Sequence, residues 1–354
     1  MNRRIVSRLR TLMLLLSGLL LTAVGGNAWG QAATWPIPDW QVVPPDAAGL
    51  SAAGVARVGQ WLAQHGSKTG LLIRHGRIVG EWYFGDTKPT SKLLVHSVTK
   101  SFSSVAVGVA IADGRLALDT TIGQFLPELQ PAEKKKITIV ELLSMTSGVH
   151  NGSGTGDLAE PFAYARLGAP LDASPGERWE YNNTALALLS PVFKTATGQG
   201  IDQFLDARVF RPIGITPDDW SWERSADLPL PYSGLHITAR ALARFGLLMV
   251  RSGRWQDQQI VPAEWVTRSA QPSQSLEKSY GYLWWNNTTG KWPGVPADAF
   301  AAIGWLHNDM LLVPSLDLVV IRQVGNDSEY KEQFEIGDLF KLAIDAIEDH
   351  PPAK

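Results

Sequence analysis

A serine and a lysine three residues apart, Ser97 and Lys100, are the residues in this chain best suited to chemistry. At the start of a helix, residues at this spacing lie on one face, about one turn apart. A serine hydroxyl is a weak nucleophile until a neighbouring base takes its proton. Lysine can be that base only when burial keeps its amine neutral. The pair therefore predicts a nucleophile and its base, provided that a buried helix carries them.

The sequence that follows Ser97 supplies such a helix. An apolar run extends from Val105 to Ala112, and we predict a buried helix over residues 97–113. Ser275 and Lys278 have the same spacing but lie in a polar stretch, where the lysine would be solvated and protonated. We interpret that second pair as surface residues.

A second candidate motif surrounds Tyr181. Residues 175–184 read Pro-Gly-Glu-Arg-Trp-Glu-Tyr-Asn-Asn-Thr, in which Pro-Gly marks a turn and Asn183 or Thr184 can cap the following helix. One interpretation is that the Tyr181 hydroxyl helps Lys100 to move the proton of the nucleophile, while Asn183 holds the lysine or the substrate. The alternative is an ordinary turn with a capping asparagine.

The order of the predicted elements places strands near both ends of the chain and helices between them. This order predicts one sheet built from both ends, about residues 70–96 and 275–348, and an inserted, mainly helical region of about 97–270. Residues 149–170 are rich in Gly, Ala and Ser and form a candidate lid. The predicted strands are 70–75, 78–84, about 280–285, 299–304, 309–314 and 317–323. The predicted helices are 97–113, 138–146, 184–197 with a kink at Pro191, 238–252 and about 332–348.

Several sequence blocks, in the same order, resemble the serine beta-lactamase-related family. That family includes class C beta-lactamases, D-stereospecific peptidases, penicillin-recognising carboxypeptidases, esterases and 6-aminohexanoate-dimer hydrolases. The resemblance runs from about residue 45 to 345. The blocks are Ser-Val-Thr-Lys-Ser-Phe at 97–102, Ile-Thr-Ile-Val-Glu-Leu-Leu-Ser-Met-Thr-Ser-Gly at 137–148, the Pro-Gly and Tyr-x-Asn segment at 175–183, and residues 238–246, 260–265 and 280–285.

The resemblance implies an α+β fold of the beta-lactamase/transpeptidase type, with an antiparallel sheet flanked by helices. It implies that Ser97 attacks a carbonyl and forms an acyl-enzyme, that Lys100 and Tyr181 transfer the proton, and that Asn183 is a supporting polar contact. Which of Lys100 and Tyr181 is the base stays open, because the two groups are strongly coupled. The resemblance implies no cofactor.

The chain departs from the family at a third motif, which is Lys-Thr-Gly or His-x-Gly on a strand lining the site. The corresponding segment is predicted at residues 304–308, where Trp305 takes the cationic position and His307 the glycine position. Trp305, His307 and Asn308 are therefore candidate substrate-binding residues. The oxyanion hole is expected to use the Ser97 N–H and an N–H from His307 or Asn308. His307 is either a replacement cation or proton donor, or a structural histidine.

This departure favours some activities of the family over others. Without the lysine, the site lacks a partner for the carboxylate of beta-lactams and of peptide C-termini. We therefore expect hydrolysis of an ester or amide bond, with beta-lactamase, D-peptidase or carboxypeptidase activity as the alternative. An alternative of another class is a non-catalytic binding or sensor module on the same scaffold.

The N-terminal segment predicts an exported protein. Residues 1–30 combine an arginine-rich start, an apolar run too short for a confident membrane span, and small residues before Gln31. We interpret them as a signal peptide, with an uncleaved membrane anchor as the alternative, and residues 31–354 as the hydrolase domain. The expected location is periplasmic or secreted, with no stable membrane anchor after cleavage.

The composition excludes several partner classes. The formal net charge is −2 at pH 7, which gives no electrostatic case for nucleic acid or anionic lipid. The chain has no cysteine, which excludes thiol chemistry and lipoprotein anchoring, and its 7 histidines show no metal-binding spacing. The expected partner is a small ester, amide or peptide-like substrate, and no metal site is predicted.

Overall fold

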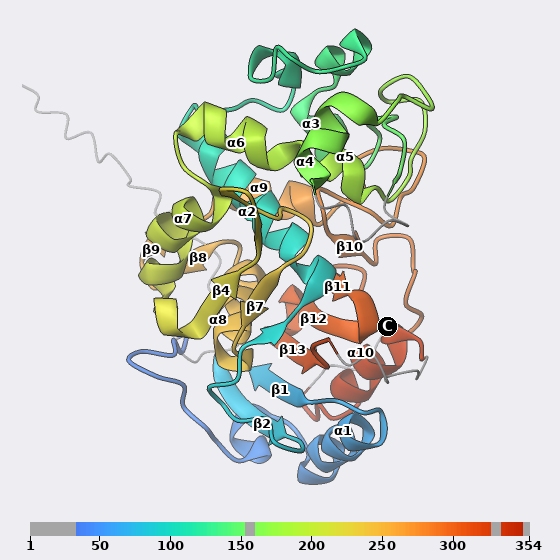
Figure 1. The fold of residues 1–354 in the computed structure, drawn as a ribbon. Helices are drawn as coiled ribbons and strands as arrows, with labels where there is room; N and C mark the ends of the chain where they lie inside the picture. The colour runs from blue at the N-terminus through green and yellow to red at the C-terminus, as the bar shows by residue number, and fades with distance from the viewer. Residues whose placement is uncertain (1–32, 153–159, 327–333, 350–354) are drawn as a thin grey trace, which may run out of the picture. The chain divides into compact units, whose positions relative to one another are not determined.

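Both ends of the chain contribute strands to one six-stranded sheet in the computed structural model (Figure 1). The strand order is β10-β11-β12-β13-β1-β2, and every neighbouring pair is antiparallel. The predicted antiparallel sheet built from both chain ends is therefore confirmed. The strands are β1 (Thr69–Arg74), β2 (Arg77–Tyr83), β10 (Trp285–Asn286), β11 (Phe300–Gly304), β12 (Asn308–Val313) and β13 (Leu318–Gln323).

The structure describes residues 33–152, 160–326 and 334–349, and residues 34–354 form one unit. The predicted signal peptide and part of the candidate lid lie outside the described residues. Within the described residues, no helix is both long and apolar enough to cross a membrane. The helices are α1 (Ala52–Gln64), α2 (Thr99–Ala112), α3 (Ile139–Leu143), α4 (Pro161–Ala163), α5 (Asn183–Ala187), α6 (Leu189–Thr197), α7 (Ile201–Leu205), α8 (Ala239–Val250), α9 (Ala263–Ser269) and α10 (Ile336–Ile344).

Short strands accompany the helices between the two sheet-forming ends. Three of them, β3, β7 and β4, form a small sheet beside the start of α2, and the other four form two hairpins. They are β3 (Leu93–Leu94), β4 (Trp220–Trp222), β5 (Arg224–Ser225), β6 (Leu228–Pro229), β7 (Leu235–Ile237), β8 (Arg254–Trp255) and β9 (Gln258–Gln259).

The large sheet has a hydrophobic core on each face because side chains alternate along a strand. On β13, Val319 and Ile321 belong to the core that contains the buried residues of α2 and α8. Leu318 and Val320 belong to the other core, which α1 and α10 complete. The sheet therefore separates α2 from the pair of helices formed by the two chain ends.

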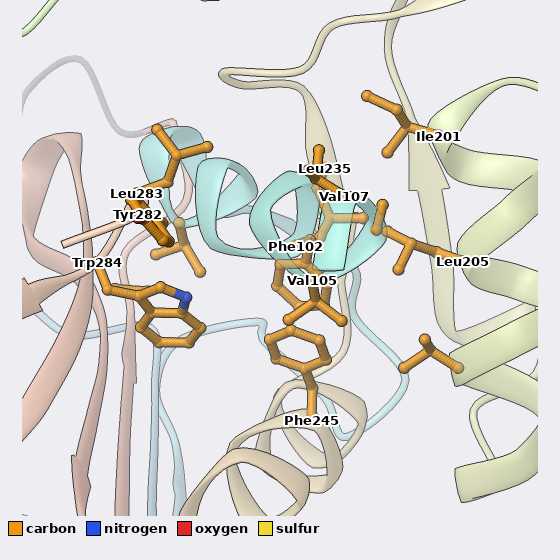
Figure 2. Packing of buried hydrophobic residues seen from close by; sticks show 14 of the residues in the cluster. Phe102, Val105, Val107, Ile201, Leu205, Leu235, Phe245, Tyr282, Leu283 and Trp284 are labelled. Atoms are coloured by element: carbon orange, nitrogen blue, oxygen red, sulfur yellow. The ribbon is translucent and has the colours of Figure 1, made fainter. Parts of the chain in front are cut away.

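Helix α2 is buried almost all round, as the sequence predicts. Its aromatic residue Phe102 stacks on Phe245 of α8, with 3.8 Å between ring centroids. Figure 2 shows Trp284 on one side of this helix and Leu205 of α7 on the other. A helix enclosed in this way holds any polar residue in its first turn away from water.

Three predictions differ from the structure. Residues 149–170, which the sequence suggests as a loop, include α4 and a helical turn over Tyr164–Gly168. The predicted helix 184–197 is two helices that meet at Leu188, because Pro191 has no N–H to donate to the carbonyl of Ala187. The predicted strand 280–285 is instead mostly a turn, in which the Gly281 N–H donates to the Trp284 carbonyl and Leu283 has a φ of 64°.

Candidate active site

Ser97 lies in a single 3-10 turn, His96–Val98, that leads directly into α2. His96 has a φ of 48°, a left-handed backbone that is uncommon for a residue other than glycine. Ser97 is the second residue of the turn, so its N–H has no acceptor within the helix that follows. Its side chain is half-buried. The turn therefore presents both the hydroxyl and the N–H of the same residue.

Lys100 lies one turn further along α2 and is 1% exposed. Its Nζ is 2.8 Å from the Ser97 Oγ and 2.9 Å from the carbonyl oxygen of Tyr232. No acidic side chain in the described part of the chain forms an ion pair with it. Burial lowers the pKa of this amine well below 10.5. This shift favours the neutral form of the amine, which is the form that can accept a proton from the serine.

Polar residues on α2 fix the segment that carries the Tyr232 carbonyl. The Ser103 hydroxyl donates to the Pro231 carbonyl at 2.7 Å, and the Leu235 N–H donates to the Thr99 hydroxyl at 3.2 Å. One N–H of Lys100 is thus held by a carbonyl whose position α2 itself determines. Sequence reasoning missed Tyr232, because it acts through its backbone and any residue type supplies a carbonyl.

Tyr181 completes the polar cluster at the nucleophile. Its ring centroid is 4.7 Å from the Lys100 Nζ, and its hydroxyl forms a side-chain hydrogen bond with Ser97. Burial raises the pKa of the phenol to about 12, and the hydrogen bond with Ser97 opposes that rise. At neutral pH the Tyr181 hydroxyl is therefore protonated and can donate.

The residues after Tyr181 fix its place. The residue that caps α5 is Asn182, whose Oδ1 accepts from the Ala185 N–H at 2.8 Å, whereas the sequence pointed to Asn183 or Thr184. Asn183 is the first residue of the helix, and its Oδ1 is buried without a hydrogen-bond partner in the part of the chain that the structure describes. Asn183 is thus adjacent in sequence to the candidate site and has an unsatisfied acceptor.

The Tyr181 ring belongs to a cluster of four aromatic residues, which we call the aromatic wall: Trp179, Tyr181, Tyr280 and Trp285. The rings of Tyr181 and Trp285 stack with 6.2 Å between centroids. Tyr280 lies edge-on to both of these rings, at 6.0 and 4.8 Å, and Trp179 lies edge-on to Trp285 at 6.4 Å. Trp179, Tyr181 and Trp285 are partly exposed, so the wall is accessible beside the nucleophile.

The structure places Trp305 next to the nucleophile turn. Its side chain is 61% exposed, and its ring meets the His96 ring edge-on with 5.2 Å between centroids. Asn308 is fully buried, and all its side-chain polar atoms are used. Its Nδ2 donates to the carbonyls of Trp305 and Gly325, and its Oδ1 accepts from the N–H groups of Val324 and Gly325. The Asn308 side chain thus holds the turn, and no atom of it is left to bind a substrate.

His307 points away from the other candidate site residues. Its ring stacks on Phe334 at 4.1 Å, and its Nδ1 lies 3.5 Å from the Asp309 carboxylate. Asp309 lies on the side of β12 opposite to Met310, which belongs to the core around α2. These contacts favour the structural interpretation of His307.

The edge of β11 offers a further candidate oxyanion donor besides His307 and Asn308. The Ala299 carbonyl accepts from Asn287, so by alternation Ile303 directs its N–H toward the same edge. β10 pairs only as far as Ala301, which leaves the Ile303 N–H beyond the end of that strand. The next residue, Gly304, lies against the nucleophile turn, because a Cβ there would come within 2.4 Å of the Val95 carbonyl oxygen.

No group of three or more potential metal ligands occurs among the described residues. The polar atoms gathered at Ser97 are a hydroxyl, a buried amine, a phenol and backbone groups. This set suits acyl transfer through a serine.

Comparison with known proteins gives the family. The Beta-lactamase family model matches residues 71–324. An uncharacterized protein of Alkalihalophilus pseudofirmus is 25% identical over 291 residues, which are 71% of this chain and 82% of that protein. Esterase EstB of Burkholderia gladioli is 33% identical over 148 residues, which are 34% of this chain and 36% of EstB.

A solved structure shares the fold. The crystal structure of a family VIII carboxylesterase matches with a TM-score of 0.68 and 16% identity, over 84% of this chain and 99% of the other. At this level of identity the likeness concerns the fold alone. Together with the family match and the esterase relative, it leads to one conclusion: the chain belongs to the beta-lactamase family and is a serine hydrolase.

Proposed function

We propose that the protein cleaves an ester or amide bond of a small substrate through an acyl-enzyme on Ser97. One observation carries the proposal: a buried lysine amine, without an acidic partner among the described residues, lies 2.8 Å from the serine hydroxyl. In that setting the amine is the base and the hydroxyl becomes the nucleophile.

Lys100 and Tyr181 then have different roles. The Lys100 Nζ takes the proton of Ser97 while the oxygen bonds to the substrate carbonyl carbon. The Tyr232 carbonyl accepts an N–H of the amine, which leaves the lone pair to face Ser97. Tyr181, with a pKa of about 12, gives its proton to the leaving group and regains one from Lys100. In the second half, water attacks the acyl-enzyme and the same groups return the proton to Ser97.

The oxyanion that forms on the carbonyl needs N–H donors that are in place before the reaction. We propose the N–H of Ser97 and the N–H of Ile303 for this role. Both are backbone groups, so the departure of the sequence at Trp305 and His307 does not remove them.

Trp305 supports an ester or amide substrate over a beta-lactam. An exposed indole beside His96 offers apolar surface where a lysine would offer charge. The esterase name of EstB points the same way. Beta-lactamase or peptidase activity is the second candidate, and the family match alone favours it.

The nucleophile can be tested against a matched serine in the same chain. Ser97→Ala is expected to abolish labelling by a fluorophosphonate and to lower kcat on a p-nitrophenyl ester by about 10³-fold or more. Ser275→Ala, at the other Ser-x-x-Lys spacing, should change neither. Equal activity of Ser97→Ala and wild type would refute the proposal, and Ser97-dependent turnover of nitrocefin would favour the second candidate.

A further inference from the structure

An exposed lysine, Lys291, lies at the outer end of the aromatic wall. Its Nζ is 4.9 Å from the ring centroid of Trp285, the residue that stacks on Tyr181. A cation over an indole face is attracted by the ring, so this position is favourable for the ammonium group. Lys291 is thereby connected to the proposed proton donor through a single side chain.

The loop around Lys291 is fixed on both sides. Asn287 is 1% exposed, and its Nδ2 donates to three backbone carbonyls within residues 292–296, while its Oδ1 accepts from the Trp292 N–H at 2.6 Å. The Trp292 ring is buried and packs on Phe340 of α10, with 4.9 Å between centroids. A ligand that meets Lys291 therefore does not have to order this loop first.

Another cation close to the wall is already paired. Arg178, next to Trp179 in sequence, lies 2.8 Å from the Glu180 carboxylate and 3.5 Å from that of Asp172. Lys291 forms no ion pair within 4.0 Å among the residues that the structure describes. Lys291 is thus a cation beside the aromatic wall that remains available for a ligand.

One acidic group, Glu277, interacts electrostatically with Lys291. The Glu277 carboxylate accepts hydrogen bonds from the Ser279 N–H at 2.8 Å and from the Ser279 hydroxyl at 2.6 Å. Its pKa is lowered first by these bonds and only last by Lys291. Glu277 therefore weakens the positive potential at Lys291 but forms no ion pair with its ammonium group.

We propose that Lys291 binds a carboxylate carried by the leaving group of the substrate. Tyr181 is the proposed donor to the leaving group, and Trp285 and Lys291 follow it along the wall, so we assign this end of the wall to the leaving group. Hydrolysis would then release an alcohol or amine that bears a carboxylate, and Lys291 itself would undergo no covalent change. This inference rests on the proposed function, because it needs Tyr181 as the donor.

Two acetate esters with related leaving groups test the proposal. These are 4-nitrophenyl acetate and 3-carboxy-4-nitrophenyl acetate, which differ in one carboxylate. Lys291→Met is expected to raise KM for the carboxylated ester by about two- to five-fold with kcat nearly unchanged, since an exposed ion pair is worth up to about that factor. KM for the neutral ester should stay the same. Lys291→Arg should keep the wild-type preference, and added salt should reduce it.

The matched control is Lys278→Met, which removes an exposed lysine from a neighbouring segment. It should leave both KM values unchanged. Equal effects of Lys291→Met on the two esters, or none on either, would overturn the proposal.

A binding measurement separates this inference from the proposed function. In the Ser97→Ala background, calorimetry should show tighter binding of 3-carboxy-4-nitrophenol than of 4-nitrophenol, and Lys291→Met should remove the difference. If Ser97→Ala still hydrolyses both esters, the catalytic assignment fails, whereas the calorimetric result still supports or refutes the carboxylate site.

Discussion

Burial shifts the pKa values of the two proposed proton-transfer groups in opposite directions. It lowers the pKa of the Lys100 amine and raises that of the Tyr181 phenol to about 12. Both shifts have one cause, since a group taken out of water disfavours its charged form. Burial therefore favours the neutral form of the amine, next to a phenol that keeps its proton at neutral pH. The two shifts thus favour the protonation states that the proposed base and acid need at the start of the reaction.

The pH dependence of kcat/KM should identify the base. It should rise with pH as Lys100 loses its proton, with a midpoint well below 10.5. Tyr181→Phe should lower kcat by about 10²- to 10⁴-fold, the usual contribution of a positioned acid or base, and keep this rise. A Tyr181→Phe profile that no longer depends on pH in this range would make the phenol the base.

At the scale of residues, the sequence predicted side chains better than backbone groups. Residue type and spacing singled out Ser97, Lys100 and Tyr181, which the structure brings together, although their catalytic roles stay predictions. Tyr232 contributes a carbonyl, and Ile303 supplies the N–H proposed for the oxyanion hole. Almost any residue type can supply such backbone groups, so no sequence signal could have singled these two residues out.

At the scale of elements, the turn between β11 and β12 connects the sheet to the nucleophile. Leu306 and His307 have φ values of 62° and 58°, a conformation that costs free energy in residues other than glycine. Arg322 holds this backbone by donating to the carbonyl of His307 at 2.6 Å. The Gly325 carbonyl accepts from Asn308 of β12 and also lies 3.2 Å from the His96 Nε2. The turn and the residue before Ser97 thus share one anchor.

Asn308→Ala should therefore affect both stability and catalysis. The loss of four hydrogen bonds in a buried site should lower the free energy of unfolding by about 1–3 kcal/mol or more. We expect kcat to fall as well, because Asn308 no longer holds Gly325, whose carbonyl contacts His96. Denaturant unfolding and kcat on a neutral ester measure the two effects.

The control for this change is Thr238→Ala, which removes the cap of α8 and should cost about 1 kcal/mol with no change in kcat. Wild-type kcat in a destabilised Asn308→Ala protein would mean that the turn only stabilises the fold.

The elements that the sequence predicted incorrectly have local physical reasons. The hydrophobic pattern of residues 280–285 predicted a strand. Leu283 instead has a left-handed backbone, which a hydrophobic pattern cannot predict. In α5 and α6 the sequence identified Pro191 correctly as the cause of a break. The missing hydrogen bond belongs to the carbonyl four residues earlier, so the chain breaks at Leu188 and not at the proline.

At the scale of the whole molecule, the sheet could be predicted from the order of elements along the chain. Strands lie near both ends and helices lie between them, so one sheet has to join the two ends. The pairing of β1 with β13, in which Leu71 lies opposite Ile321, joins segments from the two ends of the chain. The sequence did not reveal that α10 also supports the loop that carries Lys291. That support depends on the contact between Phe340 and Trp292, which lie far enough apart in sequence that no local pattern links them.

Phe340→Ala tests this long-range support. The side chain is fully buried in the core shared by α1 and α10, so its loss should lower the free energy of unfolding by about 3–5 kcal/mol. The exposed neighbour Lys341 provides the control, because Lys341→Ala removes only a surface pair with Asp345. Below the unfolding transition, kcat on a neutral ester should stay near the wild-type value, since the sheet separates this core from α2.

The preference of Phe340→Ala for the carboxylated ester should fall, because Trp292 loses the ring that it packs against and the Lys291 loop becomes less ordered. An unchanged preference would mean that the hydrogen bonds of Asn287 fix this loop without help from α10. A fall in kcat on both esters would instead mean that the two cores are coupled through the sheet itself.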